Sequence, residues 1–197
     1  MRTALDKLVS WIGLALAAVL LVAGGLLTWA STFVGNEVHT QLSQQNITMP
    51  DAETGLTALP QADQDALAPY AGQPLTTGPQ AKAYADHYIA VHMASASEGK
   101  TYSEVSSAAL AANKAAPDAP ETEALMGLRQ TLFMGSTLRG LLLYGYAFAT
   151  VGTIAGYAAW AAFAGAFLFL VLGFLGFRHA KVAGLAAPQR QQVAALV

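Results

Sequence analysis

Histidines next to carboxylates are the side chains here with the widest chemical range, because imidazole and carboxylate groups bind zinc and iron. His87 and His92 are five residues apart, about 140° around a helix, so they do not share a face. A ligand set would have to be completed by Asp86 or Glu98, and neither stands at a metal-ligand spacing. We therefore expect no metal site.

A packing role fits the residues before His92 better. Tyr84, Tyr88 and His92 follow one another at steps of four, a spacing that places side chains on one helix face. Pro79 suits the first turn of this helix. We expect His92 to pack with the two tyrosines and His87 to be exposed to solvent.

The tripeptide Gly-Lys-Thr at 99–101 is similar to the end of a phosphate-binding loop. Such a loop has a glycine five residues earlier, where this chain has alanine. Thr101 followed by Glu104 fits a capping box, in which each side chain bonds the backbone N–H of the other residue. The pattern predicts a helix over residues 102–114, and not a nucleotide site.

Catalysis by other common arrangements is also not indicated. The chain has no cysteine, which excludes disulfides, thioether-linked haem and thiolate metal sites. No serine or threonine stands in a nucleophile elbow. We expect no catalytic residues and no cofactor, so the protein should not be an enzyme. A metal-dependent membrane enzyme is the alternative that metal analysis would reveal.

Two uncharged apolar runs dominate the chain, 27 residues at 8–34 and 38 residues at 140–177. As helices they would be about 40 Å and 57 Å long, against about 30 Å for a bilayer core. Both runs predict transmembrane helices. The first is much longer than the apolar part of a signal peptide, so we expect an uncleaved anchor.

Charge predicts the orientation. Arg2 and Lys7 precede the first run, and three Lys or Arg residues within 178–190 follow the second. Residues 36–127 carry eleven acids and three lysines, a net charge of −8. Because basic flanks mark the cytoplasmic side, both termini should be cytoplasmic, with the middle segment outside the plasma membrane.

The predicted fold class is an all-α membrane protein with two transmembrane helices and a loop-rich helical segment between them. A second crossing within 140–177 would place the basic tail outside, so we expect one long helix that is tilted or protrudes. The expected parts are a cytoplasmic N-terminus (1–7), transmembrane helix 1 (8–34), an extracytoplasmic segment (35–127), a long second helix (128–177) and a cytoplasmic tail (178–197).

The extracytoplasmic segment is poor in core-forming residues. It has no Trp or Phe between Gly35 and Leu132, and residues 50–79 hold five prolines. We expect 50–79 to be loop. A segment of this composition is marginal alone, so it should gain order by resting on a partner.

A stripe of small residues marks the second span. Small side chains at steps of three and four let helix backbones approach closely in lipid. The stripe could pack on the first helix of the same chain or on a helix of another protein, and both alternatives stay open. The candidate packing residues are Gly145, Ala149, Gly152, Gly156, Ala159 and the adjacent Trp160.

Three motifs resemble a family of actinobacterial two-span membrane proteins often labelled as aromatic ring-opening dioxygenase subunits. The patterns are QL…IT(V/M)xxDA, then GP…I…H…GKTYxE(L/V), then SxLR; in the first of them this chain has one residue, Pro50, where the pattern has two. The matching residues are Gln41, Leu42 and 47–52, then Gly78, Pro79, Ile89, His92 and 99–105, then 136–139. The candidate external contacts are Tyr84, Tyr88, His92, Lys100, Thr101, Tyr102 and Glu104.

The resemblance implies a non-catalytic accessory subunit. The iron site of a dioxygenase would need a second histidine paired with His92, and His87 lies outside the family pattern. In size and topology the chain is similar to the association factor of the actinobacterial respiratory supercomplex, which joins cytochrome bcc to the cytochrome aa3 oxidase. The implied partners are integral membrane subunits of that complex and lipid, with no nucleic acid. The alternative is a cell-envelope sensor or adaptor with an extracytoplasmic ligand-binding segment.

Overall fold

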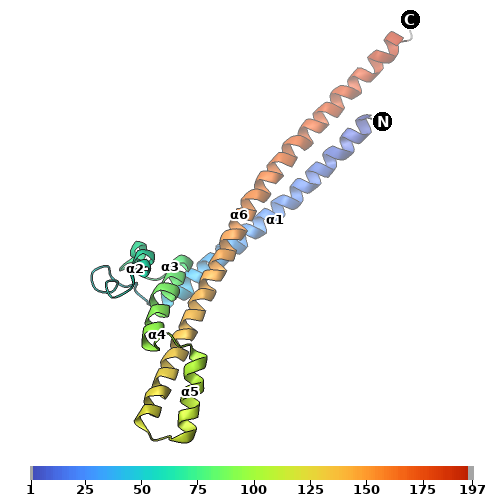
Figure 1. Cartoon of the computed structure of the whole chain (residues 1–197). Helices are drawn as coiled ribbons and strands as arrows, with labels where there is room; N and C mark the ends of the chain where they lie inside the picture. Colours follow the sequence, from blue (N-terminus) through green and yellow to red (C-terminus); the bar gives the residue numbers. More distant parts are fainter. Residues whose placement is uncertain (1, 195–197) are drawn as a thin grey trace. The chain divides into compact units, whose positions relative to one another are not determined.

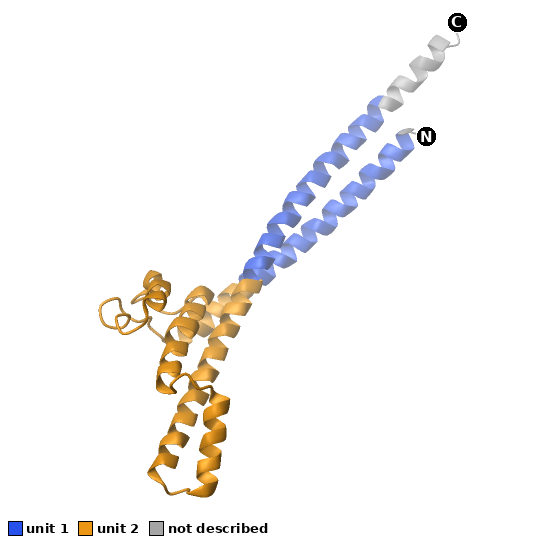
Figure 2. Ribbon diagram, viewed as in Figure 1, with its two compact units in different colours: residues 1–33, 152–197 blue, residues 34–151 orange. Residues whose placement is uncertain are grey.

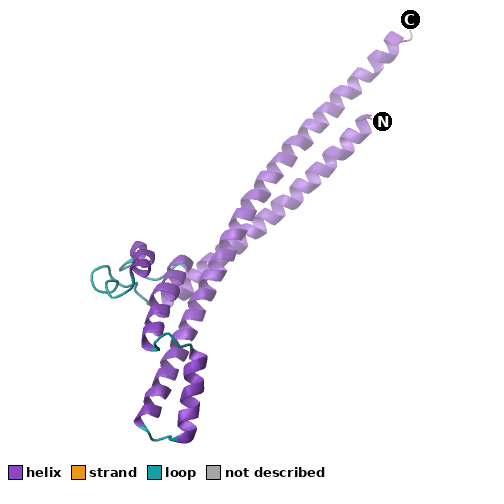
Figure 3. Ribbon diagram, in the orientation of Figure 1, coloured by secondary structure: helices purple, strands orange, loops and turns teal. Residues whose placement is uncertain are grey.

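The computed structural model describes residues 2–194, with side chains described for 3–182. It is all-helical in this part of the chain (Figures 1 and 3). The elements in chain order are α1 (Arg2–Gln44), α2 (Gln61–Leu67), the 3-10 turn η1 (Ala68–Tyr70), α3 (Gly78–Ala83), the π-helical turn η2 (Tyr84–Ile89), α4 (Ala90–Ala96), α5 (Tyr102–Ala115) and α6 (Pro120–Ala194).

The chain forms two compact units (Figure 2). Unit 1 contains residues 1–33 and 152–197, and unit 2 contains residues 34–151. Two helices, α1 and α6, are long and apolar enough to cross a membrane.

In unit 1, α1 and α6 pack as an antiparallel pair on glycines. A Cβ built on Gly24 would lie 2.8 Å from the Phe163 ring, and one on Gly173 would lie 3.1 Å from Leu14 Cδ2. Such close approach requires glycine and is typical of helix pairs in membranes. Most large apolar side chains point away from the partner helix; Trp29, for example, is 66% exposed. This outward apolar surface suits lipid, where no hydrophobic force buries it.

The first part of the uncharged run of α6 belongs to unit 2. There Gly145 lies beside Leu42 of α1, and a Cβ built on Gly78 of α3 would lie 3.3 Å from the Tyr146 Cα. The Lys82 ammonium lies 5.6 Å from the centre of the Tyr146 ring. A lysine at this level is not compatible with a hydrocarbon environment.

The excess length of this run therefore has a structural explanation. Residues 140–151 pack within unit 2, and the 26 residues 152–177 belong to unit 1. The part of the uncharged run of α1 that lies in unit 1, residues 8–33, has the same length. The expectation of a single unbroken helix over 140–177 is confirmed, since α6 is continuous there.

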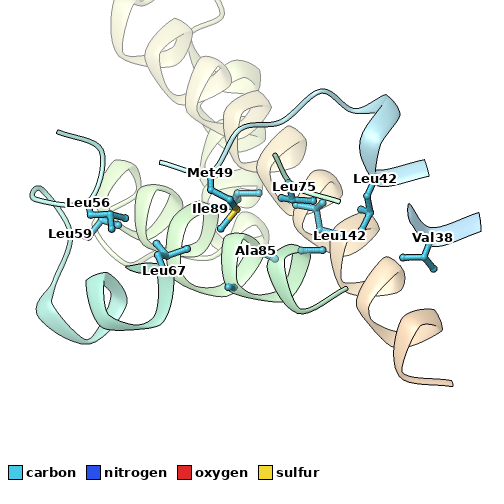
Figure 4. Close-up of a cluster of buried hydrophobic side chains, with 12 residues drawn as sticks. Val38, Leu42, Met49, Leu56, Leu59, Leu67, Leu75, Ala85, Ile89 and Leu142 are labelled. Atoms are coloured by element: carbon cyan, nitrogen blue, oxygen red, sulfur yellow. The ribbon is translucent and has the colours of Figure 1, made fainter. Parts of the chain in front are cut away.

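Unit 2 has its own hydrophobic core (Figure 4). It is aliphatic, with Met49, Leu67 and Leu75 almost completely buried. Residues from the two long helices complete it: Val38 and Leu42 come from α1, and Leu142 comes from α6. Low aromatic content did not prevent a core, because the ends of the long helices supply the missing apolar surface.

The expectation that 50–79 is only loop was wrong. Residues 61–70 form α2 and η1, and the buried Leu67 anchors them in the core. Upstream, the Asp51 carboxylate accepts a hydrogen bond of 2.7 Å from the Thr54 backbone N–H. Hydrogen bonds from Thr54 and its neighbours lower the pKa of Asp51 to about 2. This turn orders a segment whose prolines suggested irregular chain.

Both long helices extend beyond the expected membrane spans. Helix α1 continues outward to Gln44, as the sequence allowed, and α6 begins at Pro120, within the helix-start pattern Asp-Ala-Pro-Glu of residues 118–121. Helix α6 also continues through the expected tail to Ala194, while residues 195–197 lie outside the described part. The start at Tyr102 and the proline in the first turn of α3 are as predicted.

Candidate interaction surface

The predicted aromatic face forms a stacked row. The Tyr84 and Tyr88 rings are 4.9 Å apart, and the Tyr88 and His92 rings are 4.3 Å apart. His92 is exposed, and its Nδ1 lies 2.8 Å from the Tyr88 carbonyl oxygen. Burial raises the pKa of the Tyr84 hydroxyl. The row is therefore partly buried at Tyr84 and open at His92.

The π-helical turn η2 directs two neighbouring residues to different helices. Asp86 accepts a hydrogen bond of 2.8 Å from Arg139 Nη2 of α6, and it also pairs with Lys82. The hydrogen bond from Lys82, followed by that from Arg139, lowers the pKa of Asp86. His87 Nδ1 lies 2.8 Å from Asp63 Oδ1 of α2. His87 was expected to be free in solvent, and the structure instead places it in this contact.

The Thr101 motif is a helix cap. The Thr101 backbone N–H donates to Glu104 Oε2 at 2.7 Å, and the Glu104 N–H donates to Thr101 Oγ1 at 3.3 Å. The bond from the Thr101 N–H, followed by one of 2.8 Å from the Thr101 hydroxyl to Glu104 Oε2, lowers the pKa of the Glu104 carboxyl. Lys100 Nζ lies 3.5 Å from the exposed Glu98 carboxylate, and the Tyr102 ring lies 5.9 Å from the Phe133 ring. The motif therefore orients α5 along α6.

The candidate polar residues make structural contacts. Within the described residues, no group of three or more His, Asp or Glu is placed to hold a metal ion. Asp86 and His87 fix η2 to α6 and α2, and Thr101 with Glu104 caps α5.

The small-residue stripe of α6 faces elements of this same chain. In unit 2, Gly145 lies against Leu42, and the Ala149 methyl lies against Gly78. In unit 1, Gly152 and Ala159 are buried, and a Cβ built on Gly156 would lie 3.0 Å from Ser31 Oγ. Of the two alternatives for the stripe, packing on the chain's own helices is what the structure has. Trp160 lies off the stripe and is 78% exposed.

In unit 2, α6 also has large apolar side chains that are exposed, one of which, Phe133, contacts the Tyr102 ring of α5. They recur at helical spacings and so lie along one broad side of α6, next to Gly145 of the stripe. Their exposure ranges from 36% at Leu138 to 66% at Tyr144. We call this set the outer apolar face: Phe133, Met134, Leu138, Leu141, Tyr144 and Phe148.

The sequence did not lead us to expect this face; of its six residues only Leu138 was named, within the 136–139 motif. Apolar residues at steps of three and four, as at Met134, Leu138 and Leu141, were the available signal. That signal was ambiguous, because the same spacing also describes a buried helix face.

Comparison with protein families, with curated proteins and with solved structures found no match. Function is therefore inferred from the chain's own residues, above all from the outer apolar face, and the motif resemblance indicates the kind of partner.

Proposed function

We propose that this protein is a non-catalytic accessory subunit that supports assembly or stability of a membrane complex, the respiratory cytochrome bcc–aa3 supercomplex being the specific candidate. In this proposal α1 and α6 cross the plasma membrane through unit 1, both termini are cytoplasmic, and unit 2 lies outside. The partners are integral membrane subunits of the complex.

The outer apolar face is the observation that carries the proposal. Lys82 and Asp86 lie at the same level of unit 2 as this stretch of α6, which indicates an aqueous surrounding. Large contiguous apolar patches exposed to water mark interaction sites. The outer apolar face starts at Phe133 and continues to Phe148, on a part of α6 that projects from the membrane in this proposal. It is therefore suited to bind a partner helix that also projects from the membrane.

Two further observations support a structural role. The polar residues of unit 2 that resemble catalytic or metal-binding groups are engaged in ion pairs and caps. The core of unit 2 is closed by α1 and α6 themselves. Unit 2 would therefore present a preformed surface, which lowers the ordering cost of association.

The test is purification of the tagged full chain from its native membrane in mild detergent. We expect a stoichiometric complex with the absorbance of b-, c- and a-type haems. Leu141→Glu adds a charge to the outer apolar face, where the side chain is 61% exposed, and should abolish co-purification without unfolding the chain. Ser107→Glu adds the same charge at an exposed position of α5 and should retain it. Recovery of the unaltered chain alone, without haem absorbance, would reject the proposal.

A further inference from the structure

A pocket of about 290 Å³ opens on the seam between α1 and α6 within unit 1. Thr28, Ser31 and Thr32 of α1 line one side, and Gly156, Ala159, Trp160 and Phe163 of α6 line the other. The absence of a side chain at Gly156 makes room for the Ser31 hydroxyl. The pocket therefore has an apolar aromatic side and a side rich in hydroxyl groups.

Two of these hydroxyls make no hydrogen bond with another residue in the part of the chain that the structure describes. Hydroxyls in helices commonly donate to the carbonyl four residues earlier, as Thr28 does to Gly24 at 2.8 Å. Among the described residues, neither Ser31 nor Thr32 makes such a bond, and the Trp160 indole N–H also has no acceptor. Three residues with such donors thus line one pocket, and a polar group left unpaired in lipid costs free energy.

Aromatic residues indicate the depth of the pocket. Trp and Tyr gather at the two membrane–water interfaces. Trp11 and Trp29 are 18 residues apart on α1, which is about 27 Å along a helix and close to the ~30 Å of a hydrocarbon core. Ser31 and Thr32 lie just beyond Trp29, on the side towards Glu37. In a bilayer this is the level at which fatty-acid esters meet the headgroups.

We propose that this pocket binds one glycerophospholipid of the leaflet next to unit 2. Its ester carbonyls accept hydrogen bonds from Ser31, Thr32 and Trp160, and an acyl chain runs along Phe163. No charged side chain lines the pocket, so recognition is of the ester region and is independent of the headgroup. The site depends on the proposed membrane crossing but not on any partner subunit.

The probe is phosphatidylcholine brominated high on its acyl chains, which quenches a nearby tryptophan. The protein is the full chain in detergent with Trp11→Phe and Trp29→Phe, so that Trp160 alone fluoresces. We expect saturable quenching at one lipid per chain. Unbrominated phosphatidylcholine and phosphatidylglycerol should reverse it equally. Quenching that rises in proportion to the lipid fraction without saturating would overturn the proposal, and so would a strong headgroup preference.

Ser31→Ala with Thr32→Val removes two donors at nearly constant volume. We expect the quenching midpoint to rise about tenfold, from the loss of two neutral hydrogen bonds. The control is Thr150→Val, outside the pocket, where the hydroxyl already donates to the Tyr146 carbonyl; its midpoint should stay within about twofold. Circular dichroism and elution volume verify the fold. An unchanged midpoint in the double variant would overturn the hydrogen-bonding role.

Two additional measurements separate this site from its alternatives and from the proposed function. Displacement of the brominated lipid by a quinone at far lower concentration than by phospholipid would reassign the pocket and overturn the proposal. Flotation with liposomes tests the membrane crossing by itself. The titration uses the isolated chain, so lipid binding can be shown even if haem co-purification fails. Likewise, haem co-purification can be found even if the titration shows no lipid binding.

Discussion

Asp86 and Arg139 are 53 residues apart in sequence, and Asp86 Oδ1 lies 2.8 Å from Arg139 Nη2. This contact joins η2 to α6 in unit 2. The Asp86 side chain is 21% exposed, so the pair is only partly screened by water. The Asp86 carboxylate also binds Lys82, so it pairs with two cations, Lys82 and Arg139, in one charge cluster.

Asp86→Asn removes the charge from this carboxylate while keeping its size. We expect the opening free energy of the 84–89 turn to fall by about 1 kcal/mol, between the values for exposed pairs and for charged hydrogen bonds. Hydrogen exchange of the full chain should show about fivefold faster exchange there. Lys100→Ala, which breaks only the exposed 3.5 Å contact with Glu98, is the control and should leave exchange unchanged. Equal rates in Asp86→Asn and the natural chain would contradict the assigned role.

The same pair sets a pH dependence. The folded chain lowers the pKa of Asp86 below its ordinary value of 3.8, mainly through Lys82. Stabilisation by the ionised Asp86 carboxylate is therefore fully present above pH 3.8. It is lost as the pH falls through the lower pKa that Asp86 has in the folded chain. The difference in exchange between the natural chain and Asp86→Asn should be constant at higher pH and shrink below 3.8. A difference that grows on acidification would show that the sign is wrong.

Thr101→Ala removes one half of the capping box of α5. Loss of a threonine cap costs about 1 kcal/mol of helix stability; Glu104 keeps the bond from the backbone N–H of residue 101 but loses the one from the Thr101 hydroxyl. We expect the first turn of α5 to fray, with faster hydrogen exchange at the Glu104 and Val105 amides. Ser107→Ala, at an exposed position in the same helix, should not change these rates. Unchanged exchange in Thr101→Ala would mean that packing on α6, and not the cap, holds this turn.

Two glycine substitutions should have opposite effects. At Gly78 a methyl group would collide with the Ala149 side chain and lie 3.3 Å from the Tyr146 Cα, so Gly78→Ala should destabilise unit 2 by about 1–3 kcal/mol. Gly127 in α6 has open space around it, so Gly127→Ala should stabilise the helix by about 0.5–1 kcal/mol. Thermal unfolding in detergent, followed by circular dichroism, measures both. A shift in the same direction for the two variants would contradict the close contact at Gly78.

Local features of the fold were predictable from sequence. The cap at Thr101 needs only residues 101–104, and a proline in the first turn of α3 needs only its fixed φ angle. The long apolar runs also predict two long helices on length alone.

Pairings between distant segments were not predictable. Nothing near His87 in sequence points to Asp63, because that contact exists only after α2 packs on η2. Helix α2 was not predicted because the segment around it is rich in proline. Pro60 and Pro69 lie at its two borders, and they do not exclude a short helix between them.

The stripe illustrates the same limit for the candidate interaction surface. Small residues such as Gly145 and Gly156 predict close approach of some helix, but spacing does not identify that helix. Only the fold shows that the neighbours are Leu42 and Ser31 of the same chain. The proposed partner surface, the outer apolar face, consists instead of large apolar residues such as Leu141.

The wide turn at Tyr84–Ile89 is a phase shift in an otherwise α-helical segment. The adjacent Asp86 and His87 of this turn contact residues on separate helices, Arg139 and Asp63. Removing one residue from this turn would restore the ordinary helical repeat and rotate everything after it by about 100°. The shortened chain would then carry α4, with His92, on a different side of the segment from Tyr84.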